Sequence, residues 1–177
     1  MKRRIPYTLV LTLFAGIIIS SCVKKPKYPT EPVIAYRDFI RYGNSSSPDA
    51  VELVLSFTDN EGDVGIDDQS DTGGVFKKGG NVYMVFFYWD TTGVDHWEYV
   101  DTDLNAPPLT TDTFMFAYSV PLVLQEGEKS QPMKGLIYAK IMDFYIFASL
   151  HKIKFDVYMY DRARHISNRI TTPEFQF

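Results

Sequence analysis

The sequence predicts an all-β protein, an antiparallel β-sandwich of about seven or eight strands that spans residues 33–177 as one domain. Aromatic residues make up 15% of the 177 residues, and most of them lie among Val, Ile and Thr, a composition typical of strands. Apolar residues recur with a period of two, whereas no segment shows a convincing period of 3.6. The length fits a single domain preceded by a short N-terminal region.

Two segments show the alternation most clearly. In residues 51–58 and 153–160 every second side chain is apolar, which predicts half-buried strands. Three further runs are apolar on both parities or alternate less cleanly, and they are expected at the centre of a sheet or at an interface: residues 82–89, 114–123 and 136–147. Thr91-Thr92-Gly93 predicts a hairpin turn. Residues 141–150 are the one helical candidate, although their Phe, Tyr and Ile content argues equally for a strand.

The segment from Phe155 to Ser167 carries a recognisable pattern, in which an alternating strand runs into Asp161-Arg162-Ala163 and a later serine. It resembles the penultimate hairpin of immunoglobulin-like and fibronectin III-like modules. In those modules Gly-Asn stands where this chain has Arg164 and His165. The resemblance implies an immunoglobulin-like sandwich and implies nothing about function.

The N-terminus predicts export and a lipid anchor. A basic start is followed by an apolar run of eleven residues, 9–19, whereas a membrane-spanning helix needs about 20. The run ends in Ser20-Ser21-Cys22, which resembles the bacterial lipobox. Residues 1–21 are therefore expected to be a lipoprotein signal peptide, and Cys22 the lipidated first residue of the mature chain. An ordinary secretory signal is the alternative. Cys22 is the single cysteine, which excludes disulfides and multi-cysteine metal sites.

Residues 22–32 predict an extended tether. Prolines at every third position favour polyproline II, so that about ten residues would hold the domain roughly 30 Å from the bilayer. Surface-exported lipoproteins of the Bacteroidota carry an acidic run after the lipidated cysteine, whereas this chain has three lysines there. The whole chain resembles small uncharacterised Bacteroidota lipoproteins. That resemblance implies attachment to outer-membrane lipid, and the basic residues after Cys22 favour the periplasmic side over the cell surface.

The charge distribution argues against nucleic acid as a partner. Removal of residues 1–21 would take away three positive charges and change the net charge from −4 to −7. Residues 42–128 carry sixteen acidic and only two basic side chains. Phosphate contacts require clustered Lys and Arg, and the sequence offers no such cluster.

The acidic segment 59–71 holds six carboxylates and no cation. A divalent ion would relieve the repulsion between these carboxylates. The candidate calcium ligands are Asp59, Glu61, Asp63, Asp67 and Asp68. An EF-hand does not fit, because Val64 stands where Gly is required and Ser70 where the bidentate Glu belongs. Asp59–Asp63 looks like the Asp-x-x-Gly-Asp loop of cadherin-like sandwiches, some of which bind calcium. The alternative is a solvated loop whose side chains cap their own turns.

Motifs for catalysis are absent. The sequence has no Gly-x-Ser-x-Gly elbow, no phosphate-binding loop and no His-Glu-x-x-His, and its three histidines are widely spaced. Because two carboxylates can meet in space from any positions, an unrecognised glycoside hydrolase stays open as an alternative. A non-enzymatic protein is the prediction.

Three binding functions remain. The first is an accessory subunit that docks on another envelope protein through a sheet face or edge. The second is a glycan-binding module that uses aromatic rings as stacking platforms. The third is a calcium-stabilised, adhesion-like module. The aromatic candidates for partner or glycan binding are Tyr83, Phe87, Trp89, Trp97 and Tyr99.

Overall fold

The computed structural model describes residues 26–66, 80–92, 94–99, 115–124 and 128–177. Cys22 and residues 1–25 lie outside this part, as do Asp67 and Asp68. In the described residues the chain forms nine strands and one 3-10 helix. They are β1 (Val33–Asn44), β2 (Ser47–Asp59), β3 (Val82–Asp90), β4 (His96–Tyr99), β5 (Met115–Tyr118), β6 (Met133–Met142), η1 (Phe144–Leu150), β7 (Lys152–Met159), β8 (Ile170–Thr171) and β9 (Phe175–Gln176). No helix among the described residues is long and apolar enough to cross a membrane.

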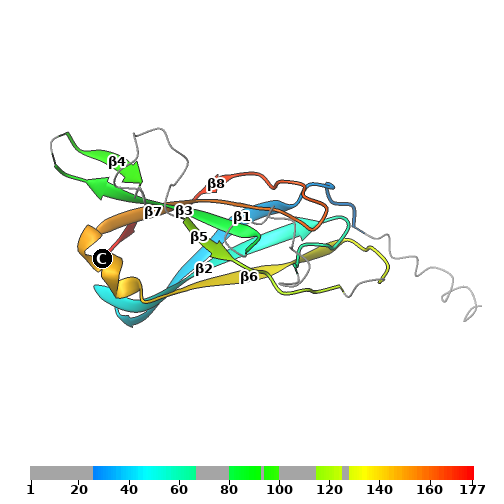
Figure 1. The fold of residues 1–177 in the computed structure, drawn as a ribbon, viewed down its shortest axis with the longest axis horizontal. Helices are drawn as coiled ribbons and strands as arrows, with labels where there is room; N and C mark the ends of the chain where they lie inside the picture. Colours follow the sequence, from blue (N-terminus) through cyan, green and yellow to red (C-terminus); the bar gives the residue numbers. More distant parts are fainter. Residues whose placement is uncertain (1–25, 67–79, 93, 100–114, 125–127) are drawn as a thin grey trace, which may run out of the picture.

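The strands form two sheets that face each other (Figure 1). One has the order β1-β2-β6 and the other β4-β3-β7-β8, with β5 also paired to β3 and β9 to β7. Every pairing between these strands is antiparallel. This order matches strands A-B-E and C′-C-F-G of immunoglobulin-like sandwiches. The predicted all-β sandwich is confirmed, with short β8 and β9 raising the strand number to nine.

The core lies between the sheets, where the two clearly alternating segments meet. In β7, Ile153, Phe155, Val157 and Met159 are all fully buried, while the residues between them are half-buried. Strand β2 contributes its own alternating set from the opposite sheet, including fully buried Leu53. The predicted inward parity of both segments is therefore confirmed.

Strand β6 differs from the sequence prediction. The run 136–147 was expected at the centre of a sheet or at an interface, but β6 pairs only with β2 among the described strands and ends at Met142. Asp143 has a φ of 55°, a left-handed conformation that breaks the strand. Phe144 is fully buried and begins the 3-10 helix, so the helical candidate at 141–150 is partly realised.

The two ends of the sandwich are distinct. At the first, which we call the tether end, residues 26–32 lead into β1, while β2 and β7 end; Val33 pairs with Thr58 there. At the second, the hairpin end, β3 turns into β4 as the sequence predicted, with Asp90 opposite His96. The C-terminus lies at the hairpin end, where the amide of Phe177 donates to the carbonyl of His151.

Candidate functional site

Three aspartates meet at the tether end. Asp59 is the last residue of β2, Asp63 lies in the loop that follows, and Asp161 begins the turn after β7. One carboxylate oxygen from each lies within 4.8 Å of the others. Asp59 and Asp161 have no exposed surface, and Asp63 is half-buried. We call this group the tether-end cluster.

The loop curls around Asp59 because of Gly62. Gly62 has a φ of 75°, and a Cβ there would lie 2.6 Å from the carbonyl oxygen of Gln131, so that only glycine fits without strain. The amides of Gly62 and Asp63 both donate to Asp59 Oδ2, the second over 3.1 Å. This curl brings Asp63 back towards the carboxylate of Asp59.

The turn at residues 161–165 closes onto the same loop. The amide of His165 donates to Asp161 Oδ1 over 2.8 Å, and His165 Nδ1 lies 2.8 Å from Asp161 Oδ2. The amide of Arg162 donates to the carbonyl of Asp63 over 3.0 Å, and the amide of Ala163 donates to Asp63 Oδ2 over 3.2 Å. Two segments far apart in sequence are thereby fixed side by side.

Buried Asn81 holds the surrounding backbone in place. Its Nδ2 donates to the carbonyls of Val64 over 2.6 Å and Tyr160 over 2.9 Å. Its Oδ1 accepts from the amide of Val120 over 3.0 Å. One side chain thus joins the loop after β2, the end of β7 and the segment after β5. Asn81 was not among the residues predicted from the sequence, where its only local signal is its position directly before a strand.

Some carboxylate oxygens at the tether end have no hydrogen-bond partner among the described residues. Asp59 Oδ1, Asp63 Oδ1 and Glu61 Oε2 are buried and have no hydrogen-bond partner among the described residues. Burial raises the pKa of Asp59 to about 6; the neighbouring charge of Asp63 adds to the shift, while the Gly62 amide opposes it. Burial also raises the pKa of Asp161, against the hydrogen bond from His165. Ionised, these carboxylates are poorly compensated.

The structure brings some of the predicted calcium ligands together and leaves others apart. Asp59 and Asp63 come together as expected. Glu61 does not join the cluster, although it leaves one buried oxygen without a partner. Asp67 and Asp68 lie outside the described residues. Asp161 was not predicted as a ligand; its only sequence signal was the Asp in the hairpin pattern, which was interpreted as a feature of the fold.

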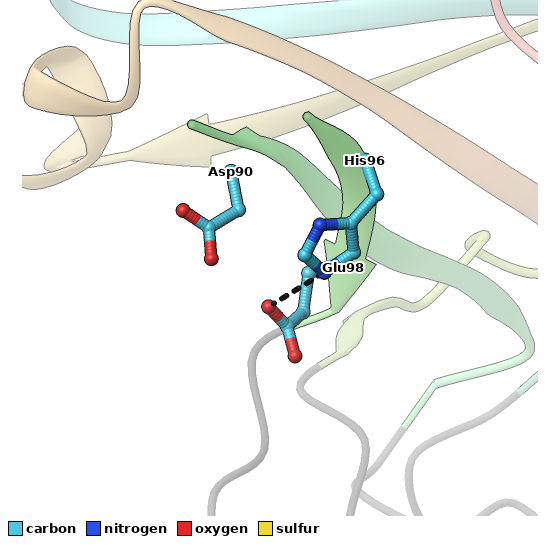
Figure 2. Close-up of side chains that lie close together, drawn as sticks. All are labelled: Asp90, His96 and Glu98. Atoms are coloured by element: carbon cyan, nitrogen blue, oxygen red, sulfur yellow. Dashed lines mark ion pairs between the residues drawn. The ribbon is translucent and has the colours of Figure 1, made fainter. Parts of the chain in front are cut away.

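A second acidic group lies at the hairpin end, where Asp90 of β3 approaches His96 and Glu98 of β4 (Figure 2). His96 Nε2 lies 3.4 Å from Glu98 Oε2, with both side chains about half exposed. Asp90 accepts hydrogen bonds from the amide and hydroxyl of Thr92, over 2.7 and 2.8 Å, and these bonds lower its pKa. Solvent and local donors therefore satisfy this group.

The aromatic candidates do not form a flat platform. Trp89 and Trp97 lie with ring centroids 5.3 Å apart but at 73°. Lysine ammonium groups occupy their faces: Lys152 lies 4.6 Å from the Trp89 centroid and Lys154 lies 4.2 Å from that of Trp97. These rings already make cation-π contacts within the chain.

The remaining aromatic candidates differ in exposure. Tyr83 is only 3% exposed and stacks on Tyr158, so the prediction that it offers a binding surface is wrong; both parities of β3 are buried over its first five residues, 82–86. Phe87 is half-buried. Tyr99 ends β4, and its side chain lies outside the described part.

The outward side of the β1-β2-β6 sheet, which we call the outer sheet face, exposes apolar side chains beside Glu52, Lys134 and Lys140. In-register residues place Ala35, Ser56 and Leu136 in one row, and Tyr42, Ala50 and Met142 in another. A hollow of about 470 Å³ opens on this face, lined by Val33, Ile34, Ala35, Arg37, Ser56, Phe57, Thr58, Lys134, Gly135 and Leu136. Gly135 leaves room for the Phe57 ring, which a Cβ would approach to 2.9 Å.

Fold and site together define an immunoglobulin-like sandwich with a buried carboxylate cluster at one end and an exposed apolar sheet face. Comparison with protein-family models, curated proteins and solved structures gave no match.

Proposed function

We propose that this chain is a non-enzymatic, lipid-anchored module of the bacterial envelope that docks another protein on its outer sheet face. One observation carries the proposal. Of the ten large hydrophobic side chains exposed among the described residues, five lie on this face: Val33, Tyr42, Leu136, Tyr138 and Met142. Tyr42 already donates to Glu52 over 2.8 Å and has Lys140 4.3 Å from its ring centroid; the other four expose apolar surface of a kind typical of interaction sites.

Strand β6 gives the face an open edge. Leu136, Tyr138 and Met142 are 50%, 47% and 63% exposed. Because β6 bonds only β2 among the described strands, no strand is hydrogen-bonded to its other edge there, and Tyr118, Val120 and Pro121 line a hollow beside Leu136 and Tyr138. Such an edge is suited to strand addition by a partner, with main-chain hydrogen bonds providing affinity and side chains providing specificity.

The hollow suggests the chemistry of the partner. Its two charged lining residues, Arg37 and Lys134, are both cationic, and Leu136 supplies an apolar wall. A protein segment with apolar side chains and a carboxylate would match this surface in both hydrophobicity and charge. The partner we propose is therefore an envelope protein that presents an acidic, apolar strand.

The sequence supports the proposed membrane anchor. The resemblance of residues 19–22 to a lipobox supports lipidation of Cys22 and attachment to the outer membrane, with the basic tether favouring the periplasmic side. Residues 26–32 enter at the tether end, while the outer sheet face runs along the flank of the sandwich. A tether of this length would leave that flank accessible to a neighbouring envelope protein.

Site-specific photo-crosslinking in intact cells tests the docking. A photoreactive phenylalanine analogue at Tyr138 is expected to give one defined protein adduct, which Leu136→Lys on the same chain abolishes. The matched control is the analogue at Tyr145, which is 54% exposed but lies in η1 at the hairpin end. Equal adducts at the two positions, or none at Tyr138, would contradict the proposal. Cys22→Ser, which removes the anchor, is expected to weaken the Tyr138 adduct.

A further inference from the structure

We propose that the tether-end cluster is a calcium site, with Asp59, Asp63 and Asp161 as its side-chain ligands. The inference is independent of the docking surface, since none of the three residues belongs to the outer sheet face. It adds Asp161, from the turn after β7, to the pair of ligands expected from the acidic loop.

Two carboxylate oxygens of the cluster are buried without a hydrogen-bond partner among the described residues. Asp59 is completely buried, its Oδ2 accepts two amide hydrogen bonds, and its Oδ1 has no partner among the described residues. Asp63 Oδ1 is likewise buried and without a partner there. A buried carboxylate oxygen with nothing to bind is costly. A cation held between these atoms would supply the missing interaction.

The negative charge of the three aspartates is also poorly compensated. Among the described residues, neither Lys nor Arg forms an ion pair with any of the three aspartates, and the one basic contact is His165 on Asp161. Three ionised carboxylates within 4.8 Å repel one another strongly in a buried setting. A single divalent cation offsets two of those charges at once.

The donor set selects calcium. The three ligands offer carboxylate oxygens only, which favour hard cations over zinc or copper. Calcium accepts six to eight oxygens in an irregular arrangement, whereas magnesium requires a near-ideal octahedron and keeps most of its water. Three oxygens from a strand end, a loop and a distant turn form an irregular set that water can complete.

The surrounding backbone is already organised for binding. Gly62 sets the curl of the loop, Asn81 fixes both flanking segments, and the Arg162 and Ala163 amides hold Asp63 against the turn. Little ordering is therefore required when the ion binds, which favours affinity. An ion here would join the end of β2 to the end of β7 at the point where the tether enters.

Thermal melting of the full chain in detergent, first treated with EDTA, tests the site. We expect 10 mM CaCl2 to raise Tm by about 3–10 °C, as follows from Kd values of about 10⁻⁴–10⁻³ M. Equal MgCl2 should give a smaller shift. Calorimetry should count one calcium per chain.

Two variants and one control variant make the test specific. Asp63→Asn should abolish the calcium shift and lower the affinity at least about tenfold, while circular dichroism shows an intact fold. Asp161→Asn should do the same and provides a second reading if Asp63→Asn does not fold. Glu98→Gln removes a carboxylate from the exposed group at the hairpin end and should leave the shift unchanged. No shift in the wild type, an equal shift with magnesium, or an unchanged shift in Asp63→Asn and Asp161→Asn would overturn the proposal.

Discussion

The two ends of the sandwich each gather three ionisable side chains, yet their physical situations are opposite. At the tether end, Asp59 and Asp161 have no exposed surface, and two carboxylate oxygens of the cluster are buried without partners among the described residues. At the hairpin end, Asp90 is bonded by Thr92 and the pair His96–Glu98 is about half exposed. The groups differ by one acid, since the hairpin end has a histidine in place of the third carboxylate, and they differ further in burial and unmet hydrogen bonding, which distinguish a candidate site from a solvated turn.

The side-chain hydrogen bonds around the two groups of ionisable residues also differ. At the tether end, Asn81 joins three segments through side-chain hydrogen bonds, whereas at the hairpin end Thr92 bonds only to nearby Asp90. The tether end is therefore expected to depend on a few buried polar side chains, and the hairpin end to tolerate change.

The largest expected effect comes from Asn81→Ala. The change leaves the carbonyls of Val64 and Tyr160 and the amide of Val120 without their partner in a buried setting, which should lower the free energy of unfolding by about 3–5 kcal/mol. Thr92→Ala at the hairpin end should lower it by less than about 1 kcal/mol. Urea denaturation in EDTA measures both. Equal losses would show that the two ends do not differ as described.

A second prediction concerns pH in the absence of calcium. The pKa of Asp59 is raised from 3.8 to about 6, so the folded state binds the proton more tightly than the unfolded state. The resulting stability is present below pH 4 and is lost as pH rises to about 6, a decline of about 2 kcal/mol attributable to Asp59. The facing groups are Asp63, Asp161 and His165, and the raised pKa of His165 acts in the same direction.

Burial also raises the pKa of Asp161, so the measurement is the difference between wild type and Asp59→Asn. The wild type should lose stability relative to the variant between pH 4 and pH 6. Parallel stability profiles in EDTA would refute the assignment of this titration to Asp59.

The smallest expected effect is a gain from Arg164→Gly. Arg164 has a φ of 74°, a left-handed conformation that is unfavourable for side chains other than glycine. Its replacement by Gly should raise the free energy of unfolding by about 0.5–1 kcal/mol, after the entropy of the unfolded chain is counted. Ala163→Gly in the same turn, where φ is not positive, should lower it instead. A loss in both variants would indicate that Arg164 makes contacts that outweigh its backbone strain.

The turn around Arg164 also shows which parts of the fold could be predicted from the sequence. The alternation in β2 and β7 was sufficient to predict the sandwich, because each strand buries one face only. The hairpin pattern was sufficient as well, since Arg164 adopts a left-handed conformation that suits the Gly expected at this position from the pattern. Strand β6 packs its inner side at the interface between the sheets, one of the two places expected, but it lies at the edge and not at the centre of its sheet; an edge strand with apolar side chains on both faces looks like a central strand in sequence.

The site was only half predictable. Asp59 and Asp63 are close in sequence, and Gly62 between them indicated the curl. Asp161 comes from the turn after β7, and only the packing of the two sheets brings it to Asp59. The prediction for Tyr83 failed for a related reason, because an apolar strand does not show which of its aromatic rings are covered by neighbouring strands.

The most direct test of the central claim, that the tether-end cluster is a set of buried charges suited to a cation, is the stability of Asp59→Asn with and without calcium. Asparagine keeps the size of the side chain and an oxygen for the two amides, while removing one charge. In EDTA at pH 7.5 the variant should be more stable than the wild type, by about 1–2 kcal/mol. In 10 mM CaCl2 the order should reverse. The same order of stability in both buffers would contradict the account.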